Sequence, residues 1–133
     1  MKRILWIEDD AEILKNLFSP IKKEGFEITT IRTYKEYLNI SDHEFSNYIL
    51  SVIDLMIPAG KEMLSNENET ILGFSIVEHI RLKRLSNIPI IVLSAFLGAI
   101  ESNKDDLLKL PPISVLPKPI LPSELRDEII RLL

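Results

Sequence analysis

The sequence contains no cysteine, which rules out a disulfide framework and a zinc site built on cysteine ligands. No apolar run approaches membrane-spanning length, and the N-terminal segment MKRILWIEDD has too few apolar residues for a signal peptide. The formal net charge of −4 argues against a nucleic-acid-binding surface, which needs clustered lysine and arginine. We therefore expect a cytoplasmic protein without direct membrane or nucleic-acid contacts.

Internal repeats and linkers are also missing, so nothing marks a domain boundary. A chain of 133 residues, with 46% hydrophobic and 27% charged residues, suits one folded domain with a substantial core. We expect residues 1–133 to form a single domain.

Short apolar runs predict the strands. Ile, Val and Leu dominate four runs that do not alternate with polar residues, which is typical of strands buried on both faces of a parallel sheet. The runs are Ile4–Ile7, Ile49–Ile53, Ile88–Leu93 and Ile113–Leu116. A fifth segment, Glu27–Ile31, alternates more and is expected at an edge of the sheet.

The segments between these runs have helical spacing. Pro20 falls inside the first helix, which should therefore kink or end early, and Pro122 suits the first turn of the last. Two further helices are expected at Tyr34–Asn39 and Ala99–Leu110. The remaining helices are predicted from three apolar stripes: Ile13, Leu14, Leu17, Phe18 and Ile21; Phe74, Val77 and Ile80; and Leu125, Ile129 and Leu132.

Strands and helices thus alternate along the chain. Right-handed crossovers then predict an α/β fold, a doubly wound five-stranded parallel sheet with helices on both faces. One segment departs from this regularity. Ala59–Leu72, AGKEMLSNENETIL, follows the third strand, is mostly polar, and is longer than most loops between strand and helix.

The ends of the strands carry the candidate site, because open α/β sheets bind ligands beyond the carboxyl ends of their strands. These ends supply Glu8 and Asp9, Asp54, Ser94, and Lys118. Each pair of like charges about 4 Å apart costs roughly 1–4 kcal/mol, and a hard divalent cation such as Mg²⁺ removes that cost. Asp10, beside them, suits a helix cap.

The motifs IEDD, IDLMIP, LSA and PKP follow in this order, each at the end of a predicted strand. Together they resemble the receiver domain of two-component response regulators, over almost the whole chain. The resemblance implies a flavodoxin-like sheet with strand order 2-1-3-4-5. It also implies that Asp54 is the phosphoacceptor, that Asp9 and Asp54 bind Mg²⁺ directly, and that Glu8 acts through water. The backbone carbonyl of Met56 would be a further ligand.

Two more residues receive roles from the same resemblance. Ser94 would donate a hydrogen bond to a phosphoryl oxygen, and Lys118 would place a positive charge beside another. The Lys118–Pro119 peptide bond is expected to be cis.

The resemblance also implies how such a protein works. It would not be an enzyme with a separate substrate, because it would catalyse only its own phosphorylation and dephosphorylation. A sensor histidine kinase or phosphotransfer protein would donate the phosphoryl group. We expect a stand-alone receiver, monomeric or dimerising on phosphorylation, that signals to a protein target. Its partner face would combine the Ala99–Leu110 helix, the Ile113–Leu116 strand and the last helix.

Three features depart from the family pattern. Val115 stands where the family usually has an aromatic ring that moves on phosphorylation, and no aromatic residue follows Phe96. The polar segment Ala59–Leu72 places Gly73, the glycine expected to open the next helix, farther along the chain than in the family pattern. This segment is either a lid or docking element or a solvated loop. Met56 and Phe96 place two apolar side chains beside the path of hydrolytic water, which predicts a long-lived phosphoaspartate.

Three other functions compete with a phosphorylated receiver. A pseudo-receiver, an interaction module that is never phosphorylated, is favoured by Val115 but opposed by the complete set of site residues. A phosphatase of the haloacid dehalogenase type needs a second aspartate where Met56 stands. A flavin carrier needs a phosphate-binding loop where EDDAE would repel the phosphate.

Overall fold

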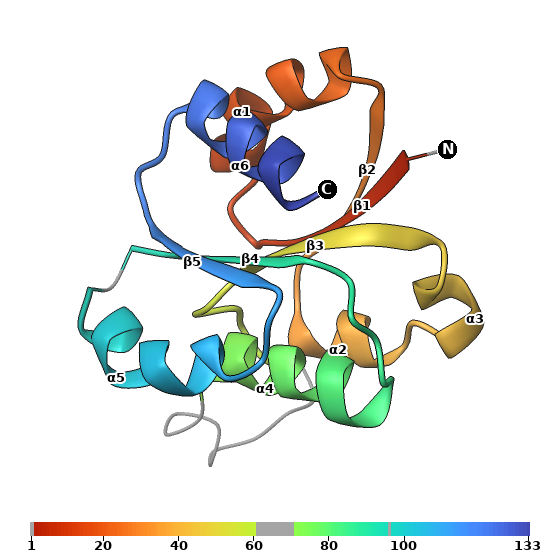
Figure 1. Cartoon of the computed structure of the whole chain (residues 1–133), viewed down its shortest axis with the longest axis vertical. Coiled ribbons are helices and arrows are strands. Elements are labelled where there is room, and N and C mark those ends of the chain that lie inside the picture. The colour runs from red at the N-terminus through yellow and green to blue at the C-terminus, as the bar shows by residue number, and fades with distance from the viewer. Residues whose placement is uncertain (1, 61–70, 96) are drawn as a thin grey trace.

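Five parallel strands form one sheet in the computed structural model, which describes residues 2–60, 71–95 and 97–133 (Figure 1). The strands are β1 (Lys2–Ile7), β2 (Phe26–Ile31), β3 (Tyr48–Asp54), β4 (Ile90–Ser94) and β5 (Ile113–Pro117). Their order across the sheet is β2-β1-β3-β4-β5, and every neighbouring pair is parallel. The predicted fold class and strand order are confirmed, with the alternating segment at an edge as expected.

Helices cover both faces of this sheet, as predicted (Figure 1). On one face lie α1 (Ala11–Lys23) and α6 (Pro122–Leu132). On the other lie α2 (Tyr34–Leu38), α3 (Asp42–Phe45), α4 (Leu72–Glu78) and α5 (Leu97–Leu108). A π-helix, η2 (His79–Lys83), continues α4, and the Arg84 N–H bonds the His79 carbonyl five residues back at 2.9 Å. Within the described ranges, no helix has the length and apolar character to cross a bilayer.

The alternation of side chains along each strand divides the core into two layers. On β1, Ile4 and Trp6 pack with residues of α1 and α6, whereas Leu5 and Ile7 pack with residues of α2 and α4. β3 and β4 divide their apolar residues in the same way. Both faces of the central strands are therefore buried, which is why their sequences do not alternate with polar residues.

Two predicted boundaries were wrong, and one short helix was not predicted. α1 does not end early at Pro20 but continues to Lys23, and Ile21, directly after the proline, is fully buried. Packing of this last turn outweighs the hydrogen bond that proline cannot donate. β4 begins at Ile90, two residues later than predicted, because Pro89 has no N–H for the ladder. The short helix α3 was not predicted, and its four residues are too few for a helical period to be recognised.

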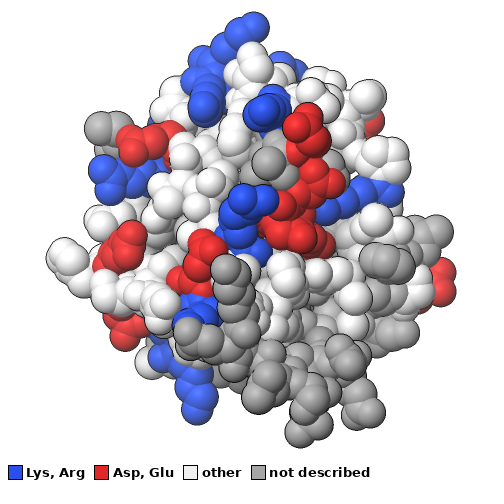
Figure 2. Space-filling model, turned by 180° about the vertical axis from the view of Figure 1, so that it is seen from behind, with Lys and Arg blue, Asp and Glu red and all other residues white. Residues whose placement is uncertain are grey.

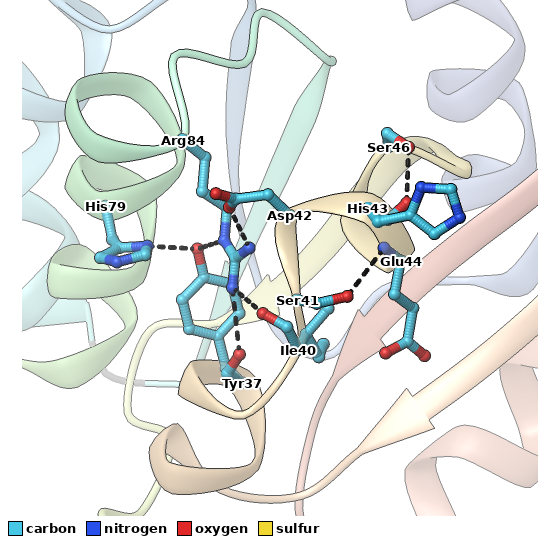
Figure 3. Close-up of polar contacts among 9 residues, drawn as sticks. All are labelled: Tyr37, Ile40, Ser41, Asp42, His43, Glu44, Ser46, His79 and Arg84. Carbon is cyan, nitrogen blue, oxygen red and sulfur yellow. Dashed lines mark hydrogen bonds and ion pairs between the residues drawn. The ribbon is translucent and has the colours of Figure 1, made fainter.

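Arg84 joins η2 to α2 and α3, and its side chain is only 4% exposed (Figure 3). Its guanidinium donates to the Tyr37 hydroxyl at 2.8 Å, to the Ile40 carbonyl at 2.7 Å and to Asp42 Oδ1 at 2.8 Å. It also lies 4.9 Å from the centroid of the Tyr37 ring. The Tyr37 hydroxyl lies 2.8 Å from His79 Nδ1. The Arg84 cluster comprises Tyr37, Ile40, Asp42, Phe45, His79 and Arg84.

The connection from β3 to α4 borders the carboxyl edge of the sheet. Its first residues are held by α2, since the Pro58 carbonyl accepts the Tyr34 N–H at 2.9 Å. Residues 61–70, most of the unusual polar segment, lie outside the described residues, so its predicted role stays a prediction. At its far end a Cβ on Gly73 would lie 2.5 Å from the Asp54 carbonyl oxygen. Glycine is required there because α4 begins so close to the end of β3.

Candidate phosphorylation site

The strand ends bring the predicted residues together on one edge of the sheet. Glu8 and Asp9 directly follow β1, and Asp54 ends β3, the neighbouring strand. Ser94 ends β4 and is fully buried, and Lys118 directly follows β5. The parallel order of these strands explains the clustering, because all their carboxyl ends lie on the same side of the sheet.

Three carboxylates form the acidic part of this edge. One oxygen from each of Glu8, Asp9 and Asp54 lies within 4.8 Å of the others. Glu8 and Asp54 are buried, whereas Asp9 is exposed, so the cluster opens to solvent on the side of Asp9. Figure 2, which views the molecule from behind Figure 1, shows acidic side chains gathered next to basic ones on that face. The arrangement offers hard oxygen ligands of the kind that Mg²⁺ prefers.

Lys118 supplies a positive charge inside the cluster. Its ammonium forms an ion pair with Glu8 and lies 3.7 Å from Asp54 Oδ2, and its side chain is 11% exposed. The Lys118 N–H donates to the Ser94 carbonyl at 2.8 Å, which fixes the lysine beside the end of β4. The predicted cis bond between Lys118 and Pro119 is confirmed.

One ammonium does not balance three carboxylates. Burial raises the pKa of the Glu8 carboxyl to about 7, and the nearby Asp54 carboxylate adds to the rise while Lys118 opposes it. The metal-free edge therefore resists carrying all its negative charges at once. A bound divalent cation would relieve this repulsion.

The backbone after β3 holds the Asp54 side chain. The Met56 N–H donates to Asp54 Oδ1 at 3.0 Å, which leaves Oδ2 on the side of Lys118. The Leu55 N–H donates to the Leu93 carbonyl at 2.8 Å and extends the pairing of β3 with β4. These bonds give the carboxylate a fixed direction without any bound ligand.

Asp10 lies beside the cluster and caps α1, as expected. Its Oδ1 accepts the Glu12 N–H at 3.1 Å, the arrangement of an N-cap residue. Its sequence neighbours point to the site, whereas Asp10 has a structural role.

Arg32 is a residue of this edge that the sequence reasoning missed. It directly follows β2, and its Nη2 donates to the Asp9 carbonyl at 3.0 Å. The other site residues were predicted from their positions at the ends of the strands. The same reasoning, applied to the end of the edge strand β2, would have predicted Arg32 as well.

Val115 and Phe96 are two of the residues that depart from the family pattern. Val115 is half-buried on β5 and packs against the core layer that contains Ile90 and Val92. Phe96 lies outside the described residues.

No family model matches the sequence, and no curated protein matches it. Solved structures do match over nearly the whole chain. The receiver domain of Francisella response regulator 1452 is 27% identical, with a TM-score of 0.74, and the match covers 99% of this chain and 96% of that one.

The fold is that of a response regulator receiver domain. The response regulator TrrA from Thermotoga maritima, solved in complex with Mg²⁺ and BeF, is 28% identical. Its TM-score is 0.73, and the match covers 100% of both chains. The non-phosphorylated HemR receiver domain from Leptospira biflexa is 25% identical, with a TM-score of 0.75 and coverage of 99% and 94%. The resemblance read from the four motifs is confirmed.

Proposed function

We propose that this receiver-fold chain accepts a phosphoryl group on Asp54, with Mg²⁺, in a two-component or phosphorelay system. The observation that carries the proposal is the position of Asp54. Its carboxylate lies 3.7 Å from the Lys118 ammonium and within 4.8 Å of oxygens from Glu8 and Asp9. A nucleophile placed between a fixed cation and a site for a second one suits phosphoryl transfer, whose transition state carries spread negative charge.

The residues present fit a magnesium ion. Ligand oxygens of one Mg²⁺ lie at most about 4.2 Å apart, since each Mg–O distance is about 2.1 Å. The three carboxylate oxygens lie within 4.8 Å of one another, close to that limit, and Glu8 need not meet it because it would act through water. Asp9 and Asp54 would hold the ion directly, Glu8 through water, and the Met56 carbonyl would add a ligand. When bound, the ion would neutralise charge on the phosphoryl oxygens.

The transfer step uses Asp54 as the nucleophile. One carboxylate oxygen attacks phosphorus as the bond from phosphorus to the donor's histidine nitrogen breaks. The electron pair of that bond stays on the departing imidazole, and an acyl phosphate forms on Asp54. Lys118 would move its charge from Asp54 Oδ2 to a phosphoryl oxygen, and the Ser94 hydroxyl would donate to another.

The partner would be a sensor histidine kinase or a phosphotransfer protein, and the product would signal through protein contacts. The chain would catalyse only its own phosphorylation and dephosphorylation. TrrA supports the proposal because it has the same fold and was solved in complex with Mg²⁺ and BeF, which contains the ion proposed here.

We also propose that the phosphoaspartate is long-lived. Met56, two residues after Asp54, has a 40% exposed side chain with no group to orient a water molecule. Replacing it by Met56→Glu should speed loss of the phosphoryl group, measured by intact mass over time. A half-life of seconds in the unmodified protein would contradict this prediction.

Binding of beryllofluoride tests the proposal. We expect Mg²⁺-dependent binding at one site, measured by isothermal titration calorimetry. Asp54→Asn should abolish it, and Asp10→Asn should not, because Asn caps a helix as well as Asp does. Failure of the unmodified, folded protein to bind would favour the pseudo-receiver, in which the same fold acts as an interaction module.

A further inference from the structure

We infer that Arg32 tunes the phosphorylation site through its positive charge. It donates to the main chain of Asp9 and places a positive charge beside the end of β2, away from Lys118, which follows β5. Its charge weakens binding of Mg²⁺ to the empty site and strengthens retention of the phosphoryl group. This inference rests on the function proposed above.

The contact with Asp9 is direct. Arg32 Nη2 donates to the Asp9 carbonyl oxygen at 3.0 Å, across the junction of β2 with the segment that follows β1. The same segment is held one residue earlier, where the Glu8 N–H donates to the Ile31 carbonyl at 3.0 Å. Ile31, the last residue of β2, and Arg32, the residue after it, thus hold the backbone of Glu8 and Asp9 in place.

Arg32 is itself held in place on the opposite side. Its backbone N–H donates to Glu36 Oε2 at 3.2 Å, and Glu36 belongs to α2. The Glu36 N–H in turn donates to the Thr33 hydroxyl at 3.1 Å, the cap of that helix. The guanidinium therefore extends from a fixed backbone rather than from a free loop.

The charge of Arg32 acts differently in the two states of the site. The empty edge has three carboxylates and the Lys118 ammonium, and an entering Mg²⁺ is repelled by both basic side chains. Once Asp54 carries a phosphoryl dianion, negative charge exceeds what Mg²⁺ and Lys118 neutralise. A second basic side chain within a Debye length, about 8–10 Å, then stabilises the loaded state.

The size of the effect follows from Coulomb's law. A unit charge about 8 Å from a divalent cation in water changes its affinity about fivefold, before screening by salt. Arg32 is exposed and its contact is to one carbonyl, so its removal should leave folding largely intact.

The experiment compares Arg32→Gln, Arg32→Lys and Arg3→Gln with the unmodified protein at low ionic strength. Arg3, at the start of β1, pairs at 3.8 Å with the exposed Glu27, so Arg3→Gln controls for the change in net charge. Calorimetry gives the Mg²⁺ affinity alone and the beryllofluoride affinity at saturating Mg²⁺. Thermal unfolding without metal gives stability.

We expect Arg32→Gln to bind Mg²⁺ about fivefold more tightly and beryllofluoride several-fold more weakly. Arg32→Lys should restore both affinities to within about twofold, because it keeps the charge, and Arg3→Gln should change neither. The inference is overturned if both affinities of Arg32→Gln are unchanged, if both fall together with stability, or if Arg32→Lys behaves like Arg32→Gln. If the unmodified protein binds neither ligand, the proposed function fails first and this inference fails with it.

Discussion

Two polar clusters differ in how their charges are balanced: the Arg84 cluster, and the carboxylate edge formed by Glu8, Asp9, Asp54 and Lys118. Arg84 directs its donors at a hydroxyl, a carbonyl and one carboxylate. At the edge, three carboxylates face two basic side chains, Lys118 and Arg32. In the Arg84 cluster the guanidinium has its hydrogen-bond acceptors and a carboxylate, whereas the carboxylate edge has an excess of negative charge that a bound cation could balance. Incomplete balance thus distinguishes the candidate site from a structural contact.

The Tyr37 hydroxyl is hydrogen-bonded to two side chains of the Arg84 cluster. Its hydroxyl accepts from Arg84 Nε and is also hydrogen-bonded to His79 Nδ1 at 2.8 Å (Figure 3). Burial raises the pKa of Tyr37 to about 12, although Arg84 opposes the rise, so the hydroxyl stays protonated.

The largest expected effect comes from removing the buried guanidinium. Arg84→Met should lower the free energy of unfolding by about 3 kcal/mol, because it leaves the Ile40 carbonyl and the Tyr37 hydroxyl without their donor. Chemical denaturation measures this loss. Arg126→Met, at an exposed pair with Asp127, is the control and should change stability little. An unchanged stability of Arg84→Met would remove the contrast between the two clusters.

Removing a charged group from the carboxylate edge should instead raise the free energy of unfolding. Without metal, Asp54→Asn should raise the free energy of unfolding by about 1 kcal/mol, because it removes a negative charge beside Glu8 and Asp9. The amide oxygen can still accept the Met56 N–H. Adding Mg²⁺ should stabilise the unmodified protein and not this variant, as measured by thermal unfolding. A metal-free variant clearly less stable than the parent would mean that Asp54 serves chiefly as the partner of Lys118.

A smaller change in stability is expected at the Arg84 cluster when the pH is lowered and His79 is protonated. Burial, together with the charges of Arg84 and Lys83, lowers the pKa of His79 below 6.5, while Asp42 opposes the shift. The unfolded chain then binds more protons between the lowered value and 6.5, so stability should fall as pH falls through that window and stay constant above it.

His79→Asn, which keeps an acceptor for the Tyr37 hydroxyl, should flatten this part of the pH profile. His43→Asn, on exposed α3, controls for the loss of a histidine and should leave the slope in place. Denaturant unfolding at a series of pH values measures both. A slope that survives in His79→Asn would assign it to another group.

The sequence predicted the strands and their ends well because both follow from local chemistry. Runs such as ILWI and SVID are apolar throughout, and the acids and the lysine of the site directly follow or end them. Parallel order then brings Asp9, Asp54 and Lys118 to one edge without any knowledge of side-chain packing. The candidate site was therefore the most predictable part of the molecule.

The Arg84 cluster could not be predicted in this way. Tyr37 and Arg84 lie 47 residues apart in the chain and meet only because α2 and η2 pack on the same face of the sheet. The π-helix that positions Arg84 has no recognisable period of its own, and α3 is recognisable only by its Ser41 cap. Such contacts depend on packing, which a single sequence does not specify.

The most direct test of the account is the intact mass of the purified protein after incubation with Mg²⁺ and a small phosphodonor such as phosphoramidate. We expect the addition of one phosphoryl group, dependent on Mg²⁺, to the unmodified protein and to Asp10→Asn, and none to Asp54→Asn. A folded, unmodified protein that gains no mass, or an Asp54→Asn variant that gains the same mass, would contradict it.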